Sequence, residues 1–121
     1  MNQKRAASAY IALFRLNDVQ LNIKDAYSVY KMKKQLEDSY QFMTEQEQKI
    51  VDQYNGVILG NGNIQFASSE IAEKAKNEMQ ALNDLEIDLD ITPISITLDA
   101  IRDGMMSPSD MESLEGFVSF V

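Results

Sequence analysis

A glycine- and asparagine-rich stretch in the middle of the chain sets the strongest limit on its fold. Residues 60–63 read Gly-Asn-Gly-Asn and lie between two short apolar runs, residues 57–59 and residues 64–66. Asn-Gly and Gly-Asn pairs supply the positive φ angles that tight hairpin turns require. We therefore expect a β-hairpin over residues 55–66, at which the chain doubles back between two helices.

The residues before the hairpin predict the longest helix of the chain, over residues 23–54. Asn22 is a good N-cap, and Asp25 stands three positions later, where it supports the cap. Thr44 begins a Thr-Glu-Gln-Glu sequence that would also cap a restarted helix, so a bend at this point is an open alternative. The second half of the helix carries a seam with the four-three spacing of a heptad pattern: Leu36, Tyr40, Met43, Glu47, Ile50 and Tyr54.

A shorter helix comes after the hairpin. Ser68 is its N-cap, Glu70 lies in its first turn, where a carboxylate suits the helix dipole, and its apolar stripe ends at Leu82. At 1.5 Å per residue the longer helix measures about 48 Å and the shorter one about 20 Å. The shorter helix therefore covers less than half of the longer one. The seam around residues 36–43 needs cover from an N-terminal helix, the C-terminal segment or another subunit.

Shorter elements are expected at both ends of the chain. Apolar residues at helical spacing predict a helix over residues 3–16. Between residues 85 and 91, Leu and Ile alternate with acidic residues, which predicts a strand. Pro93 shifts the phase of the alternation, so we place an edge, bulge or bend there. A Ser-Pro-Ser-Asp sequence predicts a short helix over residues 107–115, and an apolar tail, residues 117–121, comes after it.

These patterns predict a mainly helical α+β fold. Its centre is an antiparallel helical hairpin with a β-hairpin at its tip, joined by an N-terminal helix and by a C-terminal strand and short helix. A chain of 121 residues is expected to form a single domain, residues 1–121. Its segments are residues 1–22, 23–85 and 86–121. Because a domain of this size is marginally stable alone, a homo-oligomer is also expected.

The composition argues against an enzyme. The chain contains neither His nor Cys, so it lacks the usual general base at neutral pH, thiolate metal ligands and disulfides. We expect no catalytic residue and no cofactor. No apolar run approaches the roughly 18–20 residues of a membrane span. Arg15 and Asp18 interrupt the apolar residues after the basic N-terminus, so we expect neither a secretory signal nor a membrane partner.

Charge is distributed unevenly along the chain. Residues 1–40 contain seven Lys and Arg against four Asp and Glu, whereas residues 41–121 contain four against fifteen. The simplest interpretation is a solvated acidic surface; the alternative is an acidic face that meets a basic partner, as a nucleic-acid mimic would. Direct nucleic-acid binding is disfavoured, because Lys31, Lys33 and Lys34 form the only basic cluster.

Three carboxylates on one face of the predicted strand, Glu86, Asp88 and Asp90, are the candidate metal ligands. Alternate residues of a strand lie about 6.6–6.8 Å apart, which is too far for one ion to be held by all three without another element. The simpler interpretation is a solvated strand face that discourages edge pairing.

Apolar residues suggest where a protein partner would dock. Adaptable methionines and a terminal apolar strip are typical of partner-binding surfaces, although the strip would also fold back onto the hairpin. The partner-binding candidates, including two acidic residues, are Leu36, Tyr40, Met43, Met105, Met106, Phe117, Phe120, Asp88 and Asp90.

Several motifs occur together in this chain. Residues 16–27 read Leu-Asn-Asp-Val-Gln-Leu-Asn-Ile-Lys-Asp-Ala-Tyr, residues 86–94 read Glu-Ile-Asp-Leu-Asp-Ile-Thr-Pro-Ile, and residues 107–115 begin Ser-Pro-Ser-Asp and end Leu-Glu. With the Gly-Asn hairpin, they resemble a family of small acidic proteins from tailed phages and prophages. The helix–hairpin–helix order is also similar to prefoldin-type chaperone subunits, but here the helices are unequal and a strand and a helix come after the second one.

The phage resemblance carries no known activity. It implies a non-enzymatic protein that acts through protein–protein interaction, as an assembly factor, a virion component or an accessory protein. Its partner would be a phage structural protein or a host protein, in the host cytoplasm or the virion. One alternative is an acidic inhibitor of a host antiphage defence complex, such as an anti-CRISPR protein or a nucleic-acid mimic. Another is a divalent-metal-binding module.

Overall fold

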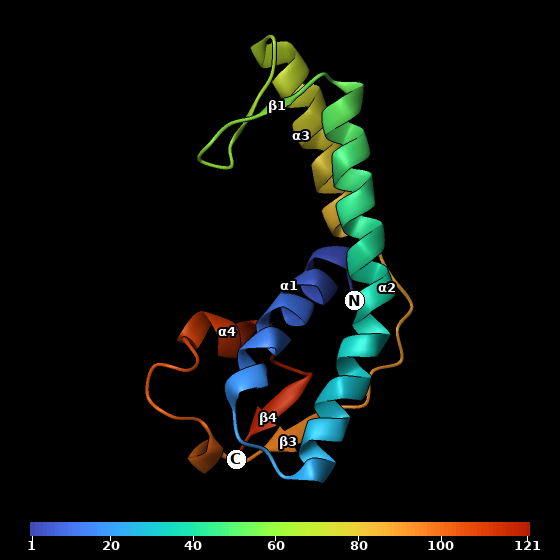
Figure 1. The fold of residues 1–121 in the computed structure, drawn as a ribbon. Helices are drawn as coiled ribbons and strands as arrows, with labels where there is room; N and C mark the ends of the chain where they lie inside the picture. Colours follow the sequence, from blue (N-terminus) through green and yellow to red (C-terminus); the bar gives the residue numbers. More distant parts are fainter.

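Helix α2, Ile23–Gln53, runs through the length of the molecule and connects its two parts (Figure 1). The computed structural model describes residues 1–121. The N-terminal half of α2 belongs to a body that contains both chain termini, and the C-terminal half belongs to an arm that ends in the β-hairpin. The helix continues unbroken past Thr44, so it does not restart there.

The body is built on the packing of α1, Gln3–Leu13, against α2. The helix expected over residues 3–16 divides into α1 and the 3-10 helix η1, Phe14–Asp18. α1 covers the part of α2 that the shorter arm helix cannot reach, so Leu36 is fully buried. The main core lies among these elements and the C-terminal strands, and its buried members are Ala6, Ala9, Ala12, Leu13, Leu16, Val19, Val29, Met32, Leu36, Ile96, Leu114, Phe117 and Val118.

The C-terminal region closes the body with a small parallel sheet. Strands β3, Ile94–Ile96, and β4, Val118–Phe120, pair in parallel, with Ile94 opposite Val118 and Ile96 opposite Phe120. The 3-10 helix η2, Leu98–Ala100, and helix α4, Pro108–Ser113, connect them. The apolar tail therefore pairs with β3 and does not fold onto the β-hairpin.

The strand expected over residues 85–91 is not formed. These residues are extended along the body, but only Glu86 takes part in a bridge, with Asn2. The regular strand begins after Pro93, in the shifted phase that the proline predicts. The physical reason is the lack of a partner: α1 begins directly after Asn2, so the N-terminus offers one bridging position and no strand.

The arm contains the C-terminal half of α2, the hairpin strands β1, Val57–Ile58, and β2, Ile64–Gln65, and helix α3, Ser69–Asp84. α3 packs against α2, as the helical-hairpin prediction requires. Few side chains of the arm are buried. Among residues 43–84 only Met43, Val51, Ala75 and Leu82 are buried, and two of them, Met43 and Leu82, contact Ala7 of α1 at the junction with the body.

Three helices begin at the polar N-cap residues that the sequence predicts. The Asn22 side chain accepts a hydrogen bond from the Asp25 backbone N–H at 2.8 Å, and the Ser68 hydroxyl accepts one from the Ile71 N–H at 3.2 Å. Ser107 and Asp110 form a complete capping box at the start of α4. Each cap satisfies a backbone donor that the first turn of a helix leaves without a partner.

The hairpin forms as the glycine pattern predicts. Gly62 adopts φ +85°, the Leu59 N–H donates to the Asn63 carbonyl at 2.7 Å, and the Gly62 N–H donates to the Leu59 carbonyl at 2.9 Å. This is the geometry of a three-residue loop with a glycine bulge. At the base, a Cβ on Gly56 would lie 2.9 Å from Ile64 Cγ2, so a glycine allows the hairpin to pack closely there.

Candidate protein-binding surfaces

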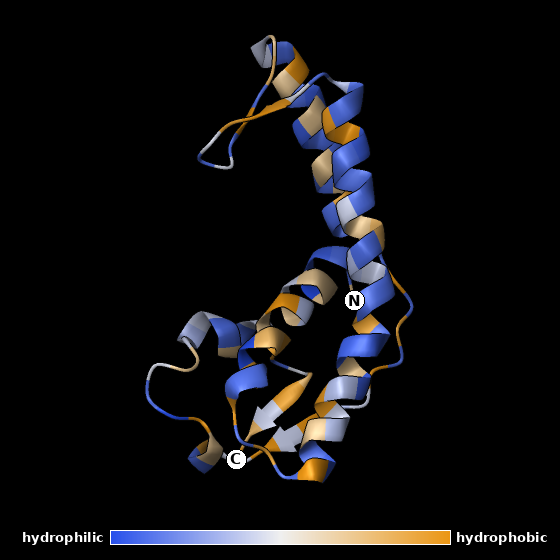
Figure 2. Cartoon of the chain, viewed as in Figure 1, coloured by the Kyte–Doolittle hydropathy of each residue, from blue (hydrophilic) through white to orange (hydrophobic).

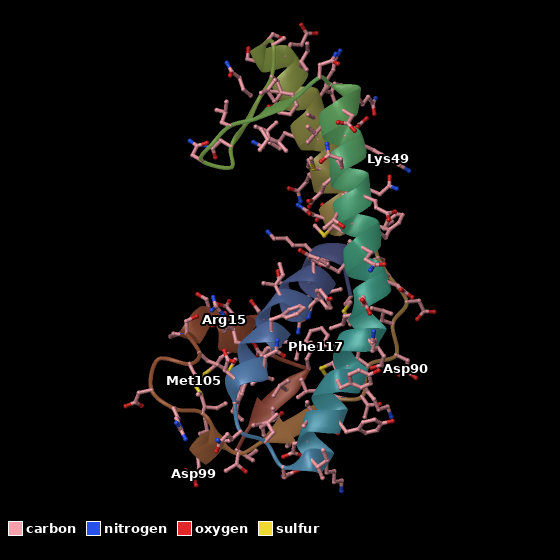
Figure 3. The ribbon with its side chains drawn as sticks, viewed as in Figure 1. Arg15, Lys49, Asp90, Asp99, Met105 and Phe117 are labelled. Atoms are coloured by element: carbon pink, nitrogen blue, oxygen red, sulfur yellow. The ribbon has the colours of Figure 1, made fainter.

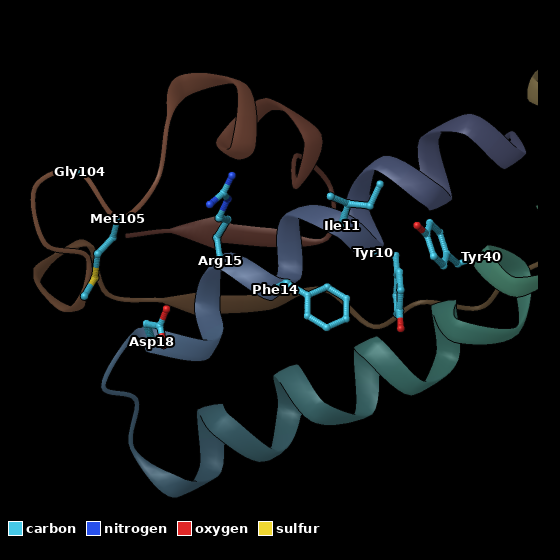
Figure 4. Close-up of a pocket in the computed structure, with 8 residues that line it drawn as sticks. All are labelled: Tyr10, Ile11, Phe14, Arg15, Asp18, Tyr40, Gly104 and Met105. Carbon is cyan, nitrogen blue, oxygen red and sulfur yellow. The ribbon is translucent and has the colours of Figure 1, made fainter. Parts of the chain in front are cut away.

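An aromatic groove lies where α1 meets α2. The Tyr10 ring stacks at a tilt on Tyr40 of α2, with 4.7 Å between ring centroids, and meets Phe14 edge-on at 5.1 Å. Tyr10 and Phe14 stand four residues apart and therefore share one face at the C-terminal end of α1. Figure 4 shows these rings side by side, with Met105 of the C-terminal loop at the other end of the groove, beyond Arg15.

The groove has a volume of about 820 Å³. Ile11 and Phe14 are 56% and 45% exposed, so the groove presents apolar surface to solvent. Its only ionic side chains are Arg15 and Asp18, and Arg15 Nε lies 3.7 Å from Asp110 Oδ2 of α4. The groove residues are Tyr10, Ile11, Phe14, Arg15, Asp18, Tyr40, Gly104 and Met105.

The basic cluster beside the groove is engaged by neighbours within the chain. Lys33 Nζ lies 4.5 Å from the Phe14 ring centroid and donates to Asn17 Oδ1 at 2.7 Å. Lys34 Nζ donates to Glu37 Oε2 at 3.2 Å, and this hydrogen bond raises the pKa of Lys34. Lys31 Nζ lies 5.7 Å from the Tyr27 ring centroid. Each of the three lysines thus has a contact within the chain.

The second exposed apolar surface is the tip of the arm. Val57 and Ile58 are each 59% exposed, and Leu59 and Ile64 are also exposed. In Figure 2 the β1 region is coloured as hydrophobic, whereas the outer faces of the arm helices are largely hydrophilic. No charged residue occurs between Asp52 and Glu70, in a chain of which 25% is charged.

The acidic residues of the segment before β3 point to solvent. Glu86, Asp88 and Asp90 are exposed, and the intervening Ile87 and Leu89 are partly buried against the main core. The alternation of apolar and acidic residues is thus preserved in an extended segment that is not a regular strand. Glu86 Oε2 lies 3.3 Å from the N-terminal ammonium.

The structure contains no group of three or more Asp, Glu, His or Cys side chains placed to hold a metal ion. Glu86, Asp88 and Asp90 are spread along the extended segment, and no second element brings a further carboxylate to them. Glu86, Asp88 and Asp90 therefore do not form such a group by themselves.

The predicted partner-binding residues divide into four groups. Leu36, Met43 and Phe117 are at most 8% exposed and belong to the packed interior, so the structure removes them from any docking surface. Tyr40 and Met105, 65 positions apart in the sequence, line the same groove. The exposed pair is Asp88 and Asp90, and the remaining two, Met106 and Phe120, are partly buried against the main core.

Sequence reasoning misses the groove residues of α1 and η1. The apolar spacing that predicts a helix over residues 3–16 includes Tyr10, Ile11 and Phe14, but such a stripe is too wide for all its members to be buried against one neighbouring helix. The signal that points to them is that Ile11 directly follows Tyr10 in the sequence. Adjacent residues of a helix point about 100° apart, so the two side chains cannot both face the same neighbouring helix.

Comparisons with protein-family models, curated proteins and solved structures give no match. None of the helices combines the length and the apolar character that crossing a bilayer requires.

Proposed function

We propose that this chain is a non-enzymatic phage or prophage protein that acts through protein–protein contacts, as an assembly factor, a virion component or an accessory protein. It would work in the host cytoplasm or in the virion. The observation that carries the proposal is the aromatic groove between α1 and α2, which exposes apolar side chains in a concave, pre-formed site of about 820 Å³.

The groove suits a short apolar segment of a partner. Aromatic side chains are enriched among residues that dominate binding energy, because they bury a large area and have few rotatable bonds. Tyr10 and Tyr40 already hold each other through ring stacking, so little side-chain ordering is required on binding. Arg15 and Asp18 offer one charge of each sign beside the apolar floor, which suits fixing the orientation of a bound segment.

The chemistry of the groove supports binding rather than catalysis. The chain has no His and no Cys, and the groove offers a single carboxylate and a single guanidinium with no adjacent nucleophile and base. A catalytic site would need such a pair within hydrogen-bond reach of a substrate.

Affinity capture from phage-infected cells tests the proposal. A tagged Ile11→Asp chain places a carboxylate in the apolar groove at an exposed position, so the fold is retained. Asn77→Asp adds the same charge on the exposed face of α3 and is the matched control. Loss of a central apolar contact typically costs about 2 kcal/mol or more, so recovery of the specific partner is expected to fall more than about tenfold with Ile11→Asp only. Equal recovery of the partner by both variants would reject the groove as the binding site.

A second candidate function is an acidic inhibitor of a host defence complex. The observation that favours it is the exposure of Asp88 and Asp90, neither of which forms an ion pair within the chain. Such carboxylates are free to meet Lys and Arg in a nucleic-acid-binding cleft. The double variant Asp88→Asn and Asp90→Asn should then lose a salt-sensitive interaction with a host protein, and unchanged binding would exclude this function.

A further inference from the structure

The β-hairpin projects from the arm with apolar side chains exposed on both of its faces. Ile58 and Ile64 lie opposite each other in the register and share one face, while Val57 points to the other, because successive strand residues alternate. All three are exposed. A two-stranded hairpin is marginally stable in water, and one that exposes apolar residues on both faces gains most from insertion into a concave site.

The same chain offers such a site. The groove is lined largely by apolar and aromatic residues, and it lies on the same side of α2 as the hairpin. In the common view of Figures 1 and 3, the hairpin projects to the left of α2, and the labelled groove residues Arg15 and Met105 also lie to its left. The length of the arm separates the hairpin from the groove of its own chain.

Charge limits where a second copy of the chain can dock. The net charge is −8, so two copies repel each other wherever charged surfaces meet. Self-association therefore requires a contact with few carboxylates. The hairpin lies within residues 53–69, which are uncharged, and the groove carries one charge of each sign.

The exposed area is sufficient for such a contact. The chain has an accessible surface of 8088 Å², whereas a compact monomer of the same mass would have about 6,600 Å². A standard interface removes about 800 Å² from each partner. The elongated chain thus exposes about 1,500 Å² more than a compact monomer would, which is more than a standard interface removes from each partner.

We infer that two copies of this chain form a two-fold symmetric dimer in which the hairpin of each copy inserts into the aromatic groove of the other. The two contacts are identical, so the assembly closes and does not extend into a filament. This inference rests on the proposed function, because it names an occupant of the same groove. A hairpin seated in the groove would have to leave before a phage or host protein could bind there.

Complementation between two variants of the full chain tests the dimer. Ile58→Asp damages the hairpin and leaves the groove intact, and Ile11→Asp does the reverse. Both positions are exposed, so both variants should retain the far-ultraviolet circular dichroism of the wild type. Light scattering on a sizing column should give wild-type protein twice the chain mass of 13.7 kDa, and should give each variant alone the mass of one chain.

Mixing the two variants restores one of the two contacts, because the intact hairpin of Ile11→Asp meets the intact groove of Ile58→Asp. A heterodimer weaker than the wild-type dimer is expected from the mixture. Hairpin-to-hairpin or groove-to-groove pairing would give no recovery on mixing and would overturn the inference. A wild-type chain that stays monomeric up to about 100 μM would also overturn it. Asn77→Asp is the charge control and should remain dimeric.

Different results would refute the proposed dimer and the proposed function. If the wild-type chain is monomeric and Ile11→Asp still loses a captured phage or host protein, the dimer is refuted and the proposed function stands. If the dimer forms as described and Ile11→Asp captures the same proteins as Asn77→Asp, the groove serves self-association alone.

Discussion

The hydroxyl of Tyr54 donates a hydrogen bond to Glu78 Oε1, with 3.0 Å between the two oxygens, and so links the end of α2 to α3 near the tip of the arm. Burial raises the pKa of Tyr54, and the hydrogen bond and the negative charge of Glu78 raise it further. The folded arm thus holds the phenolic proton more tightly than the unfolded chain does.

The stabilising effect of Tyr54 should therefore disappear in alkali. A pKa that is higher in the folded state contributes stability below the unfolded value of about 10, and this contribution is lost as pH rises through the folded value. Tyr54→Phe should lower the free energy of unfolding at neutral pH, and its difference from the wild type should shrink above about pH 10. Urea unfolding at several pH values measures this. Tyr27→Phe removes a hydroxyl at an exposed position and is the matched control.

Leu36→Ala should be among the most destabilising single changes. Leu36 is fully buried between α1 and α2, so its truncation leaves a cavity in the main core and should cost about 2–5 kcal/mol in the free energy of unfolding. Leu98→Ala removes the same atoms from a half-exposed side chain of η2 and should cost about 0.5 kcal/mol or less. Equal urea midpoints for the two variants would contradict the packing of α1 on this part of α2.

Ser107→Ala should weaken α4 by removing the hydroxyl that accepts from the Asp110 N–H at 3.1 Å. Loss of a serine N-cap typically costs about 1 kcal/mol. Ser109→Ala, two positions further, removes an exposed hydroxyl with no cap role and is the matched control. Thermal unfolding should show a lower midpoint for the first variant only, and a similar shift in both would argue against the capping box.

Gly62→Ala should open the hairpin locally. An alanine at φ +85° is strained by about 1–2 kcal/mol, whereas Gly60 has open space around it and no positive φ. Hydrogen exchange of the Leu59 amide, which donates to Asn63 in the folded hairpin, should become about five- to thirtyfold faster with Gly62→Ala. Gly60→Ala should exchange at nearly the wild-type rate. If Gly60→Ala accelerated the exchange of this amide more than Gly62→Ala did, the turn would not have the bulge geometry described.

Much of the fold can be predicted from local signals in the sequence. Asn22, Ser68 and Ser107 mark helix starts because their side chains bond to backbone donors a few residues away. The expected strand at residues 85–91 fails for the opposite reason, since a strand needs a partner and the alternating pattern cannot show whether one is present.

The helical hairpin, the turn at its tip and the unequal lengths of its two helices are evident from the sequence alone, because caps, glycines and hydrophobic periods act over a few residues. Three other features depend on the tertiary structure: α1 covers Leu36, β3 and β4 pair in parallel, and Tyr40 and Met105 line one groove. Burial depends on which distant segment lies against a residue, and packing between elements far apart in the chain sets that.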